Sequence, residues 1–413
     1  MNLDLSMAWR NIWRNSRRSV LTVLAIAFAC LLLVFMLSFQ FGGYETLINS
    51  SVTIHTGHLQ VQAKGYQENP DIRKVIARPE QIITSLRNIQ AVQAVSPRCQ
   101  TFALASSQDR TLGTMVVGID PGLEAEVSSL KDLIREGTYL REPNPDDQLA
   151  GALVGRLLAQ NLQVAPGDEI TLLGQGRDGS IAATVLQVHG IFASGMEDFD
   201  RQTLHIPLST FQEVFFMDTA VHSVVVLADE LGSVHSIESS LEKSFPEDSS
   251  LVALSWDELQ PGLKQAITLD LVSGGIFYII LVLVVAFSIL NTFLMTILER
   301  TREFGLMMAM GTKPGRLIRL VLVESMSMTF IGVMVGIGAG CLVTLYFQAQ
   351  GIYLGAAHEL LEQFGISGRI HPRLSLLSVT LGPGLVLGIT FLSALYPALK
   401  VRKLSPVQAL NAV

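Results

Sequence analysis

The chain has 413 residues, of which 49% are hydrophobic, and its mean hydropathy is +0.42. Its net charge of −7 combines two unlike parts. Residues 42–270 carry 15 basic and 30 acidic side chains, whereas the rest of the chain carries 14 basic and 6 acidic ones. An acidic central segment argues against nucleic acid as a partner. Three cysteines, two of them in apolar runs, exclude a disulfide framework.

The first 41 residues predict a membrane anchor. In Met1–Arg18, Leu and Trp recur at helical spacing beside four arginines, which is typical of an amphipathic helix at the cytoplasmic interface. The apolar run that follows is too long for the core of a signal peptide and has no A-x-A cleavage site. We therefore expect a transmembrane helix at residues 19–41, with the amino terminus in the cytoplasm.

Residues 42–270 have the pattern of a water-soluble α+β domain. A strand is predicted over Val52–Ala63 and a helix over Leu153–Leu162. The run Gly174–Gly179 fits the dinucleotide fingerprint G-x-G-x-x-G, but a strand-like run follows it where the fingerprint needs a helix. A hairpin turn is therefore favoured there. Glu197–Asp200 is interpreted as a solvated loop, and His55 and His58 as strand residues rather than metal ligands.

Three further apolar runs follow, each longer than the roughly 20 residues that span a bilayer as helix. They predict transmembrane helices at residues 271–298, 320–347 and 375–396, joined by loops at 299–319 and 348–374 and followed by a tail at 397–413. The fourth span is expected to break near Gly382–Gly384. Basic residues in the 299–319 loop and in the tail indicate the cytoplasmic side, so both termini are predicted there.

Two features of the third span point to helix packing. Gly332, Gly336 and Gly340 lie on one helical face, where they allow a neighbouring helix to approach closely. Glu324 is an ionisable residue within a span and is expected to face protein or the interface.

The loop at 299–319 carries the most specific pattern. A helix over Arg302–Met310 would end at Gly311, with Pro314 at the start of the next helix. Methionines and leucines alternate here with small residues between charged ends, as on an adaptable docking surface. An ordinary tight turn between two spans is the alternative on composition alone.

The order of residues favours the docking interpretation. Glu299–Gly311, ERTREFGLMMAMG, resembles the coupling helix of the MacB/FtsX-like ABC transporter permease family, E-R-x-R-E-[aliphatic]-G-[LM]-x-x-A-x-G, with Phe304 replacing the usual isoleucine. Val154–Asp168, Val188–Phe192 and Tyr396–Leu410 resemble further family segments. The resemblance implies an α-helical membrane protein with four transmembrane helices and a large α+β periplasmic domain inserted between the first and second.

The resemblance also implies a division of labour. The permease dimerises, as a homodimer or a heterodimer, and a separate cytoplasmic ATPase subunit binds ATP and Mg. This chain has no P-loop motif, and we expect it to bind no cofactor or metal of its own. The expected cell location is the bacterial inner membrane, with membrane lipid around the spans. The residues expected to couple the chain to the ATPase are Glu299, Arg300, Arg302, Glu303, Phe304, Gly305, Leu306, Met308 and Gly311.

Cargo is predicted from the branch that the chain most resembles, the LolC/LolE branch, which releases lipoproteins from the inner membrane. Acyl chains would then meet residues of the first two spans, namely Val34, Phe35, Leu37, Phe39, Phe277 and Leu281. The Gly174–Ser180 turn is too short for the chaperone-recruiting hook of that branch. The alternatives are a MacB-like efflux permease that works with an adaptor and an FtsX-like regulator of a periplasmic hydrolase. An enzyme is disfavoured because no convergent nucleophile, base or metal set is found.

Overall fold

The chain folds into two units, each with its own hydrophobic core, in a computed structural model. The structure describes residues 10, 13–14, 16–144, 147–245, 250–353, 355 and 369–401. Unit 1 holds the chain up to Tyr44, Ala266–Tyr353 and the chain from Arg369 onward, and unit 2 holds Glu45–Gln265. The predicted helix at Met1–Arg18 and the tail after Val401 lie largely outside the described residues.

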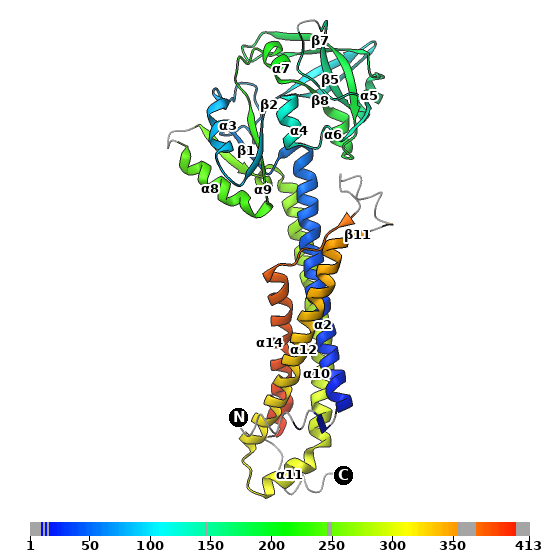
Figure 1. Cartoon of the computed structure of the whole chain (residues 1–413), viewed down its shortest axis with the longest axis vertical. Helices are drawn as coiled ribbons and strands as arrows, with labels where there is room; N and C mark the ends of the chain where they lie inside the picture. The colour runs from blue at the N-terminus through cyan, green and yellow to red at the C-terminus, as the bar shows by residue number, and fades with distance from the viewer. Residues whose placement is uncertain are drawn as a thin grey trace. The chain divides into compact units, whose positions relative to one another are not determined.

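Unit 1 is built from long helices (Figure 1). They are α2 (Ser16–Ser51), α10 (Pro261–Glu299), α11 (Thr301–Ala309), α12 (Pro314–Gln350) and α14 (Leu376–Val401), with a short pair of strands, β11 (Ile352–Tyr353) and β12 (Arg369–Ile370). The core of the unit takes Ile26 and Leu33 from α2, Phe293 from α10, Val333 from α12 and Val386 from α14. All four long helices therefore share one core.

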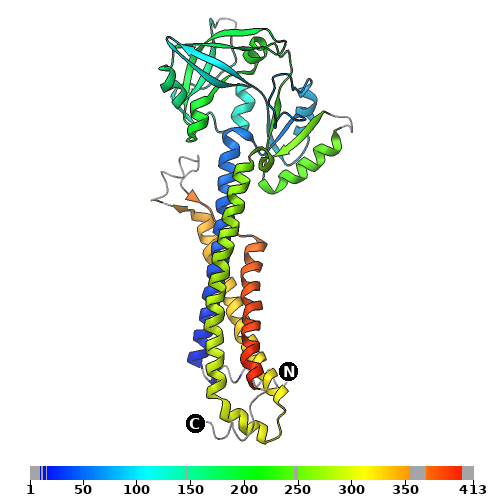
Figure 2. The same ribbon diagram turned by 180° about the vertical axis from the view of Figure 1, so that it is seen from behind.

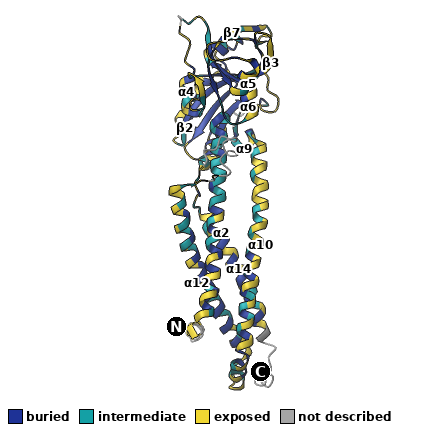
Figure 3. Cartoon of the chain, turned by 90° about the vertical axis from the view of Figure 1, so that its right-hand side faces the viewer, coloured by how far each residue is buried: buried dark blue, intermediate teal, exposed yellow. Residues whose placement is uncertain are grey.

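Among the described residues, four helices are long and apolar enough to cross a membrane: Ser16–Thr56, Pro261–Glu299, Pro314–Gln350 and Leu376–Leu399. Figure 3 shows that one side of α10 is exposed along much of its length, and Ile276, Phe277 and Val284 are among the apolar residues there. In a bilayer such a face meets lipid or another protein instead of water. The predicted break in α14 is wrong, because the helix continues through Pro383.

The glycine stripe of α12 is a packing surface, as predicted. A Cβ atom on Gly332 would lie 2.8 Å from Cβ of Ile26, and one on Gly336 would lie 2.5 Å from the carbonyl oxygen of Ala27. A Cβ atom on Gly340 would come within 3.0 Å of Cβ of Val34. The absence of side chains on this face therefore sets how closely α12 approaches α2.

We expect Gly336→Leu to destabilise unit 1 by about 1–3 kcal/mol, the usual cost of overpacking a tight core. The added side chain would meet the backbone of α2, which cannot move aside as a flexible side chain would. Gly338→Leu is the matched control, since a Cβ atom there meets nothing within 4 Å. Thermal unfolding in detergent measures the difference, and equal melting temperatures for the two variants would contradict the packing role.

Unit 2 is a mixed sheet with short helices (Figures 1 and 2). Its strands are β1 (Leu59–Ala63), β2 (Val92–Ser107), β3 (Arg110–Ile119), β4 (Ile134–Gly137), β5 (Ala150–Gly155), β6 (Glu169–Gln175), β7 (Ile181–Phe192), β8 (Thr203–Pro207), β9 (Ser223–Ala228) and β10 (Leu251–Ser255). Its helices are η1 (Val52–Thr56), α3 (Pro79–Arg87), α4 (Pro121–Val127), α5 (Arg156–Leu162), α6 (Glu197–Gln202), α7 (Leu208–Val214), η2 (Leu231–Ser233), α8 (Val234–Ser244) and α9 (Trp256–Leu259).

The sheet order is β10-β1-β9-β2-β3-β8-β5-β7-β4, and β6 pairs with both β2 and β7. Most neighbours are antiparallel, but β3 pairs with β8 and β5 pairs with β7 in parallel. The long strand β2 runs through the centre and contacts β3, β9 and β6. Its buried residues join one large core that α5, α7 and α8 also enter. The unit is therefore an α+β domain, as predicted.

The β6–β7 connection is the predicted hairpin turn. The two strands pair in antiparallel register up to Gln175 opposite Ile181, and the nitrogen of Gly176 donates to the carbonyl oxygen of Ser180 at 2.9 Å. The glycines of the G-x-G-x-x-G match thus serve a tight turn. The dinucleotide fingerprint needs a helix directly after its glycines, and here strand β7 follows them instead. A dinucleotide site is therefore excluded at this turn.

Three local predictions for unit 2 are wrong. Val52–Thr56 is a π-helix that continues α2, so the predicted strand exists only at Leu59–Ala63, and neither His55 nor His58 is a strand residue. The helix predicted over Leu153–Leu162 begins only at Arg156, because Leu153–Gly155 form the end of strand β5. A Cβ atom on Gly155 would lie 2.3 Å from the carbonyl oxygen of Asp200, so glycine is needed there. Sequence periodicity does not detect either change, since short apolar runs fit both helix and strand.

The third concerns Glu197–Asp200, which is not a solvated loop. It begins helix α6, and the buried carboxylate of Asp200 accepts hydrogen bonds from the nitrogen and hydroxyl of Ser194 at 2.8 and 2.7 Å. The acidic residues at this helix start are favoured by the positive end of the helix dipole. The cluster therefore has a structural role.

Candidate functional site

The connection between α10 and α12 contains helix α11, at the position that the sequence predicts. Helix α11 covers Thr301–Ala309, and Gly311 follows with φ of +92°, a conformation that favours glycine. The nitrogen of Gly311 donates to the carbonyl oxygen of Met308, which closes the end of the helix. Pro314 then begins α12. The ends of α11 thus follow directly from its glycine and proline.

One face of α11 is packed against the rest of unit 1. Phe304 is fully buried in a cluster with Ile297 of α10, Leu317 and Val321 of α12 and Ala398 of α14. Gly305, beside it, is also buried. The aromatic side chain therefore anchors α11 to three long helices, so movement of α11 must displace or carry them.

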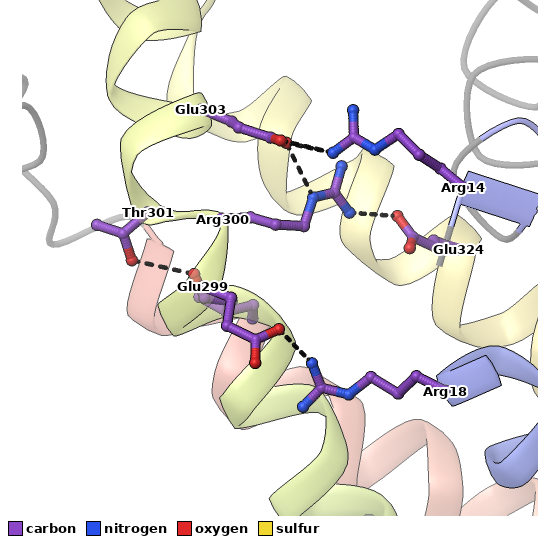
Figure 4. Close-up of polar contacts among 8 residues, drawn as sticks. Arg14, Arg18, Glu299, Arg300, Thr301, Glu303 and Glu324 are labelled. Atoms are coloured by element: carbon purple, nitrogen blue, oxygen red, sulfur yellow. Dashed lines mark hydrogen bonds and ion pairs between the residues drawn. The ribbon is translucent and has the colours of Figure 1, made fainter. Parts of the chain in front are cut away.

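A buried ion pair adds a second anchor (Figure 4). The Nη1 atom of Arg300 donates to Oε2 of Glu324 on α12 at 2.9 Å, and the two side chains are only 8% and 10% exposed. The guanidinium also lies 5.3 Å from the centre of the Phe304 ring, a cation–π contact. Breaking a buried pair of this kind is costly. Glu324 faces protein, as expected.

Exposed ion pairs link α11 and the end of α10 to the amino-terminal segment. Two bonds of 2.6 and 2.7 Å run from Nη2 of Arg14 to the carboxylate of Glu303, and Nη1 of Arg18 lies 2.5 Å from Oε2 of Glu299 (Figure 4). The Arg14 hydrogen bonds hold the pKa of the Glu303 carboxyl below its usual range, Arg300 adds to this effect, and partial burial opposes it. The carboxylates of Glu299 and Glu303 therefore form ion pairs within the chain in addition to their contact with solvent.

The opposite face of α11 is open. Leu306 is 51% and Met310 79% exposed, and Arg302, Gly311 and Lys313 are exposed too. Met307 and Met308 lie between the two faces and pack partly on the Phe304 cluster. The face is an apolar patch with basic residues beside it, the composition of a surface that receives another protein.

The predicted coupling residues therefore divide into three groups. Arg300, Phe304 and Gly305 are buried anchors, and Glu299 and Glu303 form ion pairs with the amino-terminal segment. The remaining four, Arg302, Leu306, Met308 and Gly311, lie at or beside the open face.

The predicted cargo-contacting residues differ in how far they are buried. Val34 and Leu37 are buried in the helix packing of unit 1, Val34 against Gly340 and Leu37 near Gly382. Phe35 contacts the rings of Phe39 and Phe347. Those left with exposed or half-buried surface are Phe35, Phe39, Phe277 and Leu281.

Sequence reasoning missed the partners of the charged residues, although a signal was present. Arg14 and Arg18 are four residues apart, and so are Glu299 and Glu303. Opposite charges at equal spacing on two segments attract each other when the segments lie side by side. The match of spacings, together with the lone acid Glu324 in a span, could have predicted this network.

Comparison with known families gives the wider context. A model described as FtsX-like permease C-terminal matches residues 275–406, and one described as MacB-like periplasmic core domain matches residues 19–244, more than half of the chain. The chain belongs to the MacB/FtsX family of ABC transporter permeases. Members of this family are generally permease subunits without an ATPase site, work with an ATPase and a partner permease, and are multi-pass proteins of the inner membrane.

Named relatives of this permease span the family. It is 26% identical to the uncharacterized ABC transporter permease YknZ of Bacillus subtilis, over 99% of this chain and 98% of YknZ. It is 26% identical to the pyoverdine export ATP-binding/permease protein PvdT of Pseudomonas aeruginosa, but spans only 58% of PvdT. It is 22% identical to the lipoprotein-releasing system transmembrane protein LolE of Haemophilus influenzae, over the whole of both chains.

Solved structures are similar to part of the permease. The extracellular domain of YknZ covers 48% of the chain with a TM-score of 0.34 at 13% identity. The periplasmic region of MacB from Actinobacillus actinomycetemcomitans covers 52% with a TM-score of 0.37 at 14% identity.

Proposed function

We propose that this permease receives a mechanical input from a cytoplasmic ATPase at the open face of α11 and passes it to the long helices. The observation that supports the proposal most strongly is the two-sided build of α11. One face is anchored by Phe304 and Arg300, whereas Leu306 and Met310 on the other are exposed. A rigidly anchored helix with an apolar outer face can transmit force without bending at its own base.

The proposed topology places α11 and both termini in the cytoplasm and unit 2 in the periplasm, between the first and second spans. The basic residues around α11, such as Arg302 and Lys313, support this orientation through the positive-inside rule. ATP and Mg are held by the partner ATPase, and this chain holds no cofactor. A second permease protomer, the same or different, completes the transporter.

A substitution on the open face tests the docking proposal. Leu306→Asp with Met310→Asp is expected to weaken binding of the ATPase at least tenfold, because two charges replace the apolar contact. Leu173→Asp with Ile181→Asp in unit 2 is the matched control, since these residues are 46% and 78% exposed, close to the 51% and 79% of the first pair. Co-purification of the ATPase with each variant from membranes is the measurement. Equal recovery with both would contradict the proposal.

As cargo we propose lipoproteins, which the permease would release from the inner membrane. Support comes from the match to LolE over the full length of both chains, and from the similar match to LolC of Neisseria meningitidis over 95% of LolC. The exposed Phe277 and the half-buried Phe35, Phe39 and Leu281 are the proposed contacts for acyl chains. Efflux with an adaptor and regulation of a periplasmic hydrolase are the alternatives.

Reconstitution separates these cargo alternatives. The permease and its co-purifying ATPase are placed in liposomes that carry a triacylated lipoprotein, and the lipoprotein that leaves the liposomes is measured with and without ATP. Release that requires ATP supports the proposal. Sustained ATP hydrolysis without release would instead favour the efflux or regulatory alternative.

A further inference from the structure

The first long helix ends inside unit 2 in an unusual way. A continuous helix runs from Ser16 to Thr56, and its last five residues, Val52–Thr56, form a π-helix. Gly57, with φ of +69°, ends it. A π-helical turn is wider than an α-helical one and leaves its carbonyl groups to be satisfied from outside, and such turns are frequent at functional sites.

Unit 2 supplies donors to these carbonyl groups. The nitrogen of Ser129 donates to the carbonyl oxygen of Thr53 at 2.9 Å, and Nε2 of Gln60 donates to that of Thr56 at 2.7 Å. The carbonyl oxygen of His55 accepts a hydrogen bond from Nη1 of Arg98. The helix end is therefore fixed in the domain by bonds to several elements.

Arg98 connects the end of the first long helix to strand β2 and helix α4. It lies on the central strand β2 and is buried. Its Nη2 and Nε atoms donate to the two carboxylate oxygens of Glu124 on α4, at 2.5 and 2.9 Å, and the hydroxyl of Ser96 donates to the same carboxylate at 3.0 Å. One planar guanidinium thus connects the helix end, the central strand and α4 in fixed geometry.

The pair remains charged. Burial alone would raise the pKa of the Glu124 carboxyl, but the charge and hydrogen bonds of Arg98 outweigh it and hold this pKa below its usual range. Apolar residues of similar size often give equal or greater stability than a buried ion pair. The contribution that apolar residues could not replace is the directed bond from Arg98 to the helix carbonyl.

The start of the second long helix is attached at the same place. Gln260 precedes α10, and its Oε1 atom accepts from the hydroxyl of Ser51 at 2.6 Å. Its Nε2 atom donates to the hydroxyl of Thr56 at 2.8 Å. One amide therefore ties the end of the first long helix to the beginning of the second, within unit 2.

We propose that Arg98 is a positioning residue that transmits movement of the first long helix to strand β2 and helix α4. This inference rests on the proposed function, because it assumes that an ATPase moves the long helices. Its consequence is specific: when the guanidinium is lost, the helices move as before but the centre of unit 2 no longer follows. The stiffness of this joint then sets how much of the helix movement in each ATPase cycle is transmitted to β2 and α4.

Hydrogen–deuterium exchange on the full permease with its ATPase tests the joint without a known cargo. In the wild type, ATP with vanadate is expected to change deuterium uptake in peptides of β2 and α4. In Arg98→Met with Glu124→Leu, which removes both charges together, this change is expected to fall at least fivefold while ATP hydrolysis stays within about twofold. Arg110→Met is the control, since that exposed arginine on β3 bonds to the carbonyl oxygen of Asn161 and not to the helix end.

Arg98→Lys keeps a positive charge beside Glu124 and loses the forked donor, so it serves as the second variant if the double variant does not fold. An undiminished change in β2 and α4 in either folded variant would overturn the role of Arg98. If the wild type itself shows no nucleotide-dependent change in unit 2, the proposed mechanical function fails instead.

Discussion

Arg300→Met is expected to destabilise unit 1 by about 3 kcal/mol, because it removes the guanidinium from the buried carboxylate of Glu324. The same change removes the cation–π contact with Phe304, the main apolar anchor of α11. The variant should therefore unfold at lower denaturant in detergent, and its ATPase should be poorly coupled. Equilibrium unfolding in mixed micelles, followed by helical circular dichroism, is the measurement.

Two further variants show whether the buried pair is the cause. Arg300→Met with Glu324→Met removes both charges and should recover more than about 1 kcal/mol relative to Arg300→Met alone. Glu299→Gln breaks only the exposed pair with Arg18 and should cost less than about 1 kcal/mol. If Arg300→Met is as stable as Glu299→Gln, the Arg300–Glu324 pair is not an anchor.

Acid is expected to destabilise unit 2 through three histidines. Burial lowers the pKa of His55 and of His205 to about 3 and that of His222 to about 4. Unfolded histidine titrates near pH 6.5, so below that pH the unfolded chain binds protons that the folded chain does not. The stability that these neutral histidines contribute is therefore fully present above about pH 6.5. It declines as pH falls towards their pKa values in the folded chain. From pH 7 to pH 5 the expected loss is about 2 kcal/mol per histidine, or about 6 kcal/mol for the three.

The geometry at His222 explains this effect. Its Nδ1 atom accepts a hydrogen bond from the nitrogen of Gln100 at 3.0 Å, and its Nε2 atom lies 3.2 Å from the carbonyl oxygen of Ile72. Protonation of Nδ1 would remove the acceptor that Gln100 uses. Urea unfolding at several pH values, read by Trp256 fluorescence in a chain with Trp9→Phe and Trp13→Phe, measures the slope.

His222→Gln should reduce the pH dependence by about a third, because one of the three titrating groups is gone. His235→Gln should leave the slope unchanged, since that side chain is exposed on α8. A stability that stays constant between pH 7 and pH 5 in the wild-type chain would show that none of the three histidines is held neutral by burial.

Features with a local cause were predictable from the sequence. Gly311 and Pro314 fix the end of α11 and the start of α12, because one permits positive φ and the other fits the first helical turn. The apolar runs give the four long helices by length alone. The glycines at 332, 336 and 340 indicate a packing face without identifying α2 as the partner.

Features that depend on distant residues were not predictable in this way. Arg98 and Glu124 are 26 residues apart, and nothing local marks them as a buried pair. The π-helix at Val52–Thr56 occupies a stretch whose residues alternate like a strand, so its form depends on donors such as Arg98 and Ser129. Likewise, Phe304 occupies the aliphatic position of the coupling motif but lies on the buried face of α11. A motif identifies a segment, whereas packing decides which side chains remain outside.

The contact between α11 and the ATPase is the central claim, and site-specific photocrosslinking in membranes tests it most directly. Benzoylphenylalanine is placed at Leu306, at Met310 and, as a control, at Phe330, an exposed apolar residue of α12. The account predicts adducts at Leu306 and Met310 that mass spectrometry identifies as an ABC ATPase, with none at Phe330. An ATPase adduct at Phe330, or none at either α11 position in a complex that hydrolyses ATP, would contradict it.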